Sequence, residues 1–207
     1  WLEEIGYDYL EFEEWGADLD VPYMPEPTPT IDDFDTVQYW TALRGDPLSA
    51  NPDEVSLTSS GGAAKLDFTV QGYQDSRESI YGIISMKNAA GMAMNPWVEP
   101  QDLSQGTVTF KAKLSSSLPS SKAFEVVMKD YNNDMKVWRN PITLSTSYQT
   151  VTLDPANDGV YRPGHYGARD GFDADKVKSI EIRIINVEDS SSPFTGTLWI
   201  DDLKYNP

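Results

Sequence analysis

The sequence predicts an all-β protein, a sandwich or a barrel of antiparallel strands. Residues 64–70 and 107–114 alternate apolar and polar side chains with a period of two, which is typical of strands that bury one face. Turn-forming residues separate these and other short apolar runs. No alternation of strands with helices is found along the chain, so a parallel sheet covered by helices is excluded.

Five further segments are expected to be strands, because each is a short run rich in β-branched and aromatic residues. They are residues 79–86, 124–130, 148–153, 177–185 and 197–205. Glycine, asparagine and proline mark the turns between strands. The turns are expected at Gly61-Gly62, Asn132-Asn133-Asp134, Pro163-Gly164 and residues 190–193.

Alternation along a strand divides its side chains between two faces. The residues assigned in this way to the core are Val126, Met128, Ile180, Ile182 and Ile184, and the aromatic residues Phe34 and Trp40 are assigned to it as well. The opposite, open face then carries Glu125, Val127, Lys129, Glu181, Arg183 and Ile185.

Residues 1–30 differ from the rest of the chain. They mix acidic and aromatic residues, and four prolines between Pro22 and Pro29 impose an extended, semi-rigid geometry. We therefore expect an N-terminal arm with a proline-rich linker over residues 1–30, and one folded domain over residues 31–207. The arm either docks on a neighbouring domain or subunit, or is the end of a preceding domain.

The composition of the chain excludes or disfavours several classes of binding partner and of structural site. A formal net charge of −17 disfavours nucleic acid, whose phosphates require clustered Lys and Arg. The absence of cysteine excludes disulfides and cysteine-ligated zinc. No apolar run approaches the ~20 residues that span a bilayer, so no membrane span is expected. The chain starts at Trp1 without a signal peptide, which is typical of a mature product or an excised fragment.

Over residues 31–206 the chain resembles family 11-type carbohydrate-binding modules. The resemblance is carried by Ile31-Asp32-Asp33-Phe34-Asp35, Trp40, residues 59–66, residues 172–182 and residues 194–205. The last of these ends on Ile200-Asp201-Asp202-Leu203, a closing strand that several jelly-roll sugar-binding families share. The resemblance implies a β-sandwich jelly roll of two antiparallel sheets, with an N-terminal extension. It also implies a cleft on the concave sheet, lined by Tyr, Trp and polar side chains.

Family 11 modules favour β-1,4 and mixed-linkage glucans. This chain has Leu43 and Ile80 roughly where the cleft of such a module carries tyrosines. The departure favours either a different glycan or a loss of sugar binding.

The resemblance further implies a structural calcium ion. In the jelly-roll modules that the chain resembles, an acidic residue of the first strand meets an aspartate of the last strand, and loop carbonyls complete the oxygen shell. The matching carboxylates are Asp35 and Asp201, with carbonyl oxygens near Gly62 and Lys65. The alternative is that both carboxylates simply face solvent.

The richest candidate for sugar binding is the loop before the penultimate strand. There, Tyr161 and Tyr166 are expected to stack on sugar rings, and Arg162 and His165 to hydrogen-bond hydroxyls. A lone histidine does not make a histidine-based zinc site. Further residues expected on the concave face are Arg183, Tyr131, Trp138 and Tyr81. For each aromatic residue, ordinary packing is the competing interpretation, and Trp97 is either a cleft wall or a loop anchor.

These observations predict non-catalytic binding of a polysaccharide, a β-glucan or another β-linked glycan. The chain would be secreted or lie at the cell surface, where it would target an attached glycoside hydrolase or contact a neighbouring subunit through residues 1–30. Two alternatives stay open. One is a structural or adhesive cell-surface subunit that assembles through its arm. The other is a small glycosidase that uses Glu125 and Glu181, although the chain lacks the Glu-x-Asp-x-x-Glu arrangement of small jelly-roll glycosidases.

Overall fold

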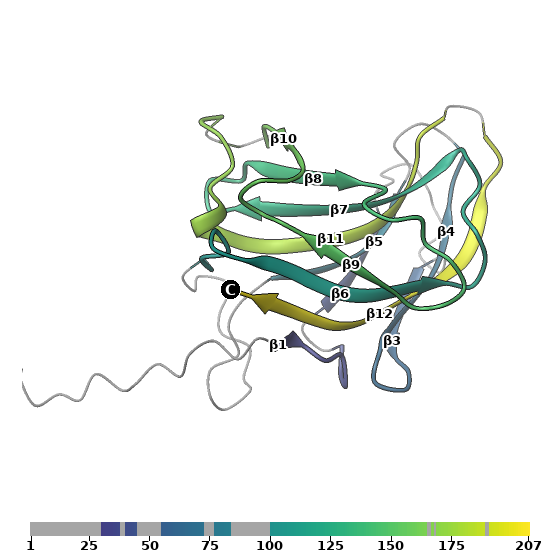
Figure 1. The fold of residues 1–207 in the computed structure, drawn as a ribbon. Helices are drawn as coiled ribbons and strands as arrows, with labels where there is room; N and C mark the ends of the chain where they lie inside the picture. The colour runs from purple at the N-terminus through teal and green to yellow at the C-terminus, as the bar shows by residue number, and fades with distance from the viewer. Residues whose placement is uncertain are drawn as a thin grey trace, which may run out of the picture.

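A computed structural model describes residues 30–37, 40–44, 55–72, 77–83, 100–164, 167, 169–188 and 191–207. They form two antiparallel sheets stacked face to face (Figure 1), so the predicted all-β jelly-roll sandwich is confirmed. Within these ranges the helical structure is a single 3₁₀ turn, η3 (Ala174–Lys176). No helix among the described residues is long and apolar enough to cross a membrane.

Sheet A is built around the 13-residue strand β12. Its strands, in spatial order, are β3 (Val55–Ser59), β4 (Ala64–Val70), β12 (Phe194–Asn206), β6 (Thr107–Leu114) and β9 (Gln149–Leu153), with β1 (Thr30–Asp32) paired to the end of β12. The register of β12 against β6 shifts between Asp201 and Lys204, where Asp202 has a positive φ of 54°. Such a bulge bends a strand.

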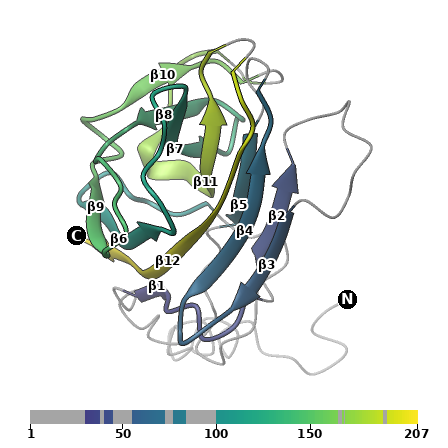
Figure 2. The same ribbon diagram turned by 90° about the vertical axis from the view of Figure 1, so that its right-hand side faces the viewer.

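Sheet B has the two most buried strands at its centre. Its strands, in spatial order, are β10 (Val160–Arg162), β8 (Met135–Arg139), β7 (Lys122–Asp130), β11 (Val177–Asn186), β5 (Arg77–Ile83) and β2 (Trp40–Arg44). Figure 2 views the sandwich from its side and shows β3 and β4 of sheet A next to β2 and β5 of sheet B.

The core lies between the sheets, where the alternation placed it. Val126, Met128, Ile180, Ile182 and Ile184 are fully buried in one apolar cluster, so their predicted positions are confirmed. Phe110 of sheet A meets Phe124 of sheet B edge to face, with ring centres 6.4 Å apart.

Phe34 and Trp40 also belong to this core, as predicted. Their rings lie 5.0 Å apart. Asp32 holds both residues in place, because its carboxylate accepts the Trp40 indole N–H at 2.9 Å and the Phe34 amide at 2.8 Å. The buried indole nitrogen is thereby satisfied.

Five strands were not predicted from the sequence. They are β1, β2, β3, β8 and β10, and each has only three to five residues. Runs this short carry little periodicity of their own. Their pairing with longer neighbours, rather than local propensity, makes them strands.

Candidate functional site

The outer face of sheet B, turned away from the core, carries a row of charged side chains. Cross-strand register sets Glu125 of β7 between Arg139 of β8 and Arg183 of β11. Glu181 lies two residues from Arg183 and therefore on the same face. The predicted orientation of Glu125, Glu181 and Arg183 away from the core is thus confirmed.

The centre of this face is not open, and in this respect the prediction was wrong. Glu125, Glu181 and Arg183 are each at most 9% exposed. Val127 and Ile185, on the same face, are also buried. Charges removed from water interact more strongly than charges at a surface, so the geometry of this charged row matters for the stability of the fold.

Glu125 is clamped by two guanidinium groups. Its Oε1 accepts hydrogen bonds from Arg183 Nε at 2.8 Å and from Arg183 Nη2. Its Oε2 accepts a hydrogen bond from Arg139 Nε at 2.9 Å. Arg183 Nη1 also reaches Glu181 Oε1 at 3.4 Å. The carboxylate is therefore held rigidly, with both of its oxygens engaged.

The two arginines fix the protonation state of Glu125. Burial by itself raises the pKa of this carboxyl, but the charges and hydrogen bonds of Arg183 and Arg139 outweigh burial and bring the pKa below its ordinary value of 4.5. A glycosidase needs one carboxyl group whose pKa is raised, so that it can donate a proton. Glu125 is the opposite case, because its lowered pKa keeps it charged at neutral pH, where it orients the two arginines.

A second carboxylate, Asp134, anchors the predicted sugar-binding loop to sheet B. Its Oδ1 accepts the Gly164 amide at 3.2 Å, and its Oδ2 accepts the Arg169 amide at 2.8 Å. The Tyr161 hydroxyl lies near this carboxylate and helps to lower its pKa. The chain passes so near that a Cβ on Gly167 would lie 2.3 Å from Asp134 Oδ1, so only glycine fits there without displacing the anchor.

These hydrogen bonds also govern the ionisation of Asp134. Burial alone raises the pKa of the carboxyl, but the donors outweigh burial and bring the pKa below 3.8. The charge on Asp134 in turn contributes to a raised pKa of the Tyr161 hydroxyl, after burial. At neutral pH the loop is therefore tied to an anion.

Asp130, the last residue of β7, secures the other end of the loop. It accepts the Asp134 amide at 2.9 Å and the Asp173 amide at 3.0 Å. Here burial dominates and raises the pKa of the carboxyl above 3.8. Asp130 and Asp134 together fix both ends of the segment from Gly164 to Asp173 on the turn between β7 and β8.

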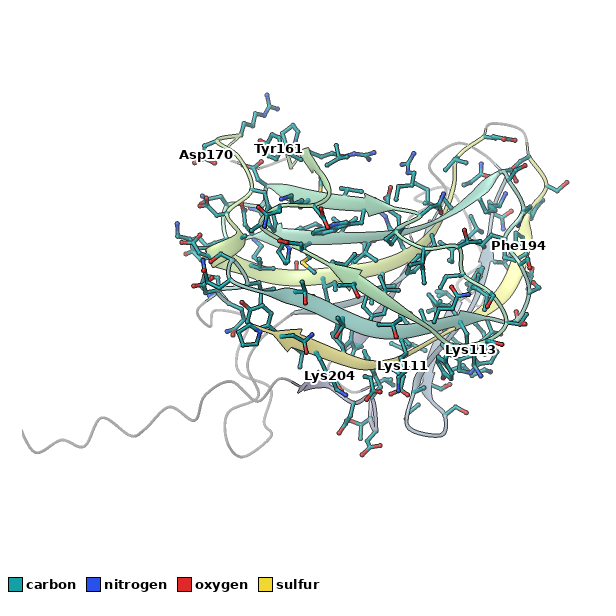
Figure 3. The ribbon with its side chains drawn as sticks, viewed as in Figure 1. Lys111, Lys113, Tyr161, Asp170, Phe194 and Lys204 are labelled. Carbon is teal, nitrogen blue, oxygen red and sulfur yellow. The ribbon has the colours of Figure 1, made fainter. Side chains whose placement is uncertain are left out.

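Besides Trp138, three of the predicted ligand-binding residues lie on sheet B with described side chains. Arg183 is in the charged row, and Arg162 of β10 is exposed and pairs with Met135, which lies on the outer face of β8. Tyr161 pairs with Lys136, which pairs with the core residue Met128, so Tyr161 lies on the opposite side of β10 from Arg162, beside the anchored loop, and is 39% exposed. Figure 3 shows Tyr161 and Asp170 at the same end of the molecule.

Trp138 was placed on the wrong face. It pairs with Val126, a core residue, and at 7% exposed it belongs to the core cluster instead of the outer face. The alternation of β8 makes this necessary, because its neighbours Val137 and Arg139 face outward. Tyr131 lies in the turn after β7 and is 64% exposed, at the end of the sheet rather than on its face.

Other predicted residues lie outside the described part of the chain. His165, Tyr166 and Trp97 are among them. For Tyr81 the backbone alone is described, and its register opposite Glu181 places it at an outer-face position of β5.

The sequence did not single out Arg139, Asp134 or Asp130 as site residues. A signal for Arg139 was present, since a hairpin turning at Asn132-Asn133 brings Arg139 opposite Glu125. For Asp134 and Asp130 the sequence carried little local signal, because the loop amides that they accept lie 30 to 43 residues away.

The predicted calcium residues gather at the turn between β3 and β4. A Cβ on Gly62, whose φ is +77°, would lie 3.5 Å from Asp35 Oδ1. Asp201 follows Ile200, which pairs with Ala64 next to that turn. Lys65 is the next residue of β4 after Ala64 and pairs with Trp199. Its ammonium group forms an ion pair with Asp67 at 2.7 Å.

These residues fit a cation site of two carboxylates and backbone oxygens. Among the described residues, nothing hydrogen-bonds the carboxylates of Asp35 and Asp201, so their oxygens are available. The same residues contain no group of three or more His, Cys, Asp or Glu side chains that would hold a metal ion. Carbonyl oxygens would therefore have to complete the shell, as Ca²⁺ allows.

Comparisons with known proteins connect this architecture to solved structures. No family model and no curated protein sequence matches the chain. A family 11 carbohydrate-binding module from Clostridium thermocellum, in complex with a β-1,3-1,4-mixed-linked tetrasaccharide, is 16% identical, with a TM-score of 0.59 over 86% of this chain and 94% of that one. The family 11 module of a cellulosomal cellulase of Clostridium thermocellum is 15% identical, with a TM-score of 0.57 over 85% and 92%.

The same fold occurs inside a larger enzyme. An agarase is 13% identical and matches with a TM-score of 0.52 over 86% of this chain, which corresponds to 24% of the agarase. At such low identities the likeness concerns the fold. This chain has the β-sandwich fold of the family 11 carbohydrate-binding modules.

Proposed function

We propose that this chain binds a β-linked polysaccharide without cleaving it, through the outer face of sheet B and the loop that Asp134 anchors. The observation that carries the proposal is the fold shared over 86% of the chain with a module solved in complex with a mixed-linkage tetrasaccharide. The charged row and the anchored loop supply a site of suitable chemistry on one sheet.

The exposed groups at this site suit sugar hydroxyls and ring faces. Arg139 is salt-bridged to Glu125, yet 41% of its side chain is exposed, so guanidinium donors remain for a ligand. Arg162 adds a second exposed guanidinium. Tyr161, on the other side of β10 beside the anchored loop, offers an aromatic face. Arg139 is already held by Glu125, so it loses little freedom on binding.

The glycan class follows from the neighbours and is to be tested directly. One neighbour is solved with a β-1,3-1,4-mixed-linked tetrasaccharide, and another is an agarase. We therefore place mixed-linkage β-glucan and agarose-type galactan first among the candidates. The chain would be secreted, and residues 1–30 would link it to a glycoside hydrolase or a neighbouring subunit.

Tyr161→Ala is expected to weaken polysaccharide binding about tenfold. Removal of the aromatic face would cost on the order of 1.4 kcal/mol, which corresponds to that factor. Affinity electrophoresis of the full chain against soluble glucans, galactans, xylans and mannans measures the effect. Tyr148→Ala is the matched control, because Tyr148 is equally exposed, at 40%, but lies directly before β9 of sheet A, beside Lys113.

Retardation by one polymer that Tyr161→Ala weakens and Tyr148→Ala preserves would support the proposal. Equal losses in both variants would place the site elsewhere. Failure of every polymer to retard the wild-type chain would reject glycan binding and favour a structural or adhesive subunit.

We further propose that Asp35 and Asp201, with backbone oxygens near Gly62 and Lys65, hold a structural Ca²⁺. The ion would join the segment after β1 to the last strand and so stabilise the fold without taking part in chemistry. Calcium is expected to raise the free energy of unfolding by about 2.7 kcal/mol when its concentration is about one hundred times its Kd.

Thermal unfolding with calcium and with a chelator measures this stabilisation. The stabilisation should vanish in Asp35→Asn and in Asp201→Asn, and persist in Asp158→Asn, which changes an exposed aspartate in the loop before β10. A wild-type melting temperature that calcium leaves unchanged would reject the site.

A further inference from the structure

The outer face of sheet A carries a surface that sugar binding on sheet B leaves unused. Four lysines, Lys65, Lys111, Lys113 and Lys204, lie there with the aromatic side chains of Tyr148 and Trp199, and we call this set the lysine face. Cross-strand register sets Trp199 between Lys113 and Lys65. In Figure 3, Lys204, Lys111 and Lys113 follow one another along β12 and β6, away from Tyr161 and Asp170.

Lys113 is the centre of the lysine face. Its ammonium lies 4.4 Å from the ring centre of Tyr148 and 4.9 Å from that of Trp199. Among the described residues it has no carboxylate partner. Two aromatic rings thus position a cation that still has its hydrogen-bond donors available.

The other lysines share a small number of acids. Lys65 pairs with Asp67 at 2.7 Å. Lys111 and Lys204 both pair with Asp202, at 2.5 and 3.2 Å. Asp201 pairs with Lys111, so the described strands of sheet A place four lysines and three aspartates on this face. The face is therefore much less acidic than the chain as a whole, whose formal net charge is −17.

The first 29 residues of the same chain have the complementary composition. They contain nine Asp and Glu residues and no Lys, Arg or His, so they account for −9 of the −17 charges. Six of them are aromatic: Trp1, Tyr7, Tyr9, Phe12, Trp15 and Tyr23. The carboxylates of this segment can form ion pairs with the lysines. Its aromatic rings can form cation–π contacts like those that already surround Lys113.

The point of attachment brings this segment to the lysine face. It joins the fold at Thr30, which pairs with Lys204 at the end of β12 (Figure 1). Trp199 lies five residues away on the same strand, roughly 16 Å at a rise of about 3.3 Å per residue. A chain of twenty-nine residues can extend much further than that distance. Because the segment is tethered to the domain, its effective concentration at the lysine face is high.

We propose that residues 1–29 dock on the lysine face of their own chain, through their carboxylates and aromatic side chains. Each surface ion pair contributes little, so docking is reversible and weakens as salt screens the charges. It occupies sheet A and leaves the proposed sugar site on sheet B free. A linker to another domain would thereby be held along one face of this domain.

Carbodiimide cross-linking of the full chain at low salt, followed by mass spectrometry, tests the contact. Cross-links within the monomer should join carboxylates of residues 1–29 to Lys113 and Lys65, and should decline at high salt. Lys129 and Lys176, which lie on and beside sheet B, serve as internal references. Equal cross-linking to these two lysines would overturn the proposal, and cross-links confined to dimers would assign the segment to a second copy instead.

A protection experiment supplies an independent readout. Cleavage after the glutamates of residues 3–26 by a Glu-specific protease should be about five- to thirtyfold faster in Lys65→Gln/Lys113→Gln than in the wild-type chain, as loss of one to two kcal/mol implies. Lys129→Gln/Lys176→Gln should cleave at the wild-type rate. Equal rates in all three proteins, with unchanged melting temperatures, would reject docking on the lysine face.

Discussion

Replacement of Arg183 by Met is expected to lower the free energy of unfolding by about 3 kcal/mol, because it leaves Glu125 buried with a single, partly exposed partner. Arg183 supplies two of the three hydrogen bonds to that carboxylate, and Glu125 is fully buried. Urea unfolding followed by circular dichroism measures the loss.

A double variant distinguishes the net contribution of the Glu125–Arg183 ion pair to stability from the cost of leaving one buried charge unpaired. In Glu125→Met/Arg183→Met both buried charges are gone, so most of the lost stability should return. Arg139 then turns to solvent from its partly exposed position. A double variant as unstable as Arg183→Met would show that packing, and not the uncompensated carboxylate, causes the loss.

The pH dependence of this loss follows from the direction of the pKa shift. In the wild-type fold the pKa of Glu125 lies below 4.5, so the ion pair contributes stability above about pH 4.5, and this contribution disappears as the pH falls through the lowered pKa. In Arg183→Met, burial is opposed by one arginine instead of two. The difference between variant and wild type should therefore be largest near neutral pH and shrink in acid. A difference independent of pH would contradict the assigned role of Glu125.

Asp134→Ala is expected to weaken polysaccharide binding about tenfold while leaving the sheets intact. The variant removes the carboxylate that accepts the Gly164 and Arg169 amides and lies near the Tyr161 hydroxyl. Tyr161 and Arg162 must then be ordered by the ligand, at about 0.5–1.5 kcal/mol per side chain. Affinity electrophoresis against the polymer that the wild-type chain binds gives the ratio of the two dissociation constants, that of the variant and that of the wild type.

Tryptic cleavage after Arg169 reports on the loop without any ligand. It should accelerate in Asp134→Ala, because the segment opens locally more often. Asp134→Asn keeps one acceptor oxygen and should fall between the variant and the wild type. Unchanged proteolysis with weakened binding would mean that Asp134 contacts the sugar itself instead of anchoring the loop.

The strand pattern predicted more of the fold than of the site. Ile180, Ile182 and Ile184 are core residues because a strand alternates its faces, and this property is local. The same reasoning failed for Trp138, since Met135-Lys136-Val137-Trp138-Arg139 shows no clean alternation. Its face was decided by the hairpin register with β7.

Contacts distant in sequence decided the candidate site. Arg183 meets Glu125 across 58 residues, and Asp134 holds amides 30 and 35 residues away. The calcium residues and the loop from Tyr161 were proposed from a resemblance and stay predictions, since His165 and Tyr166 lie outside the described residues.

By itself the sequence determined the all-β class, the longer strands and the charged side chains on the outer face of two strands, because period, turn residues and charge are local properties of a chain. Which strands are neighbours, that Glu125 is buried between two arginines, and that Asp134 anchors a loop were decided by the tertiary structure alone. Strand order and desolvation depend on the packing of the whole sandwich, and no short window of sequence contains them.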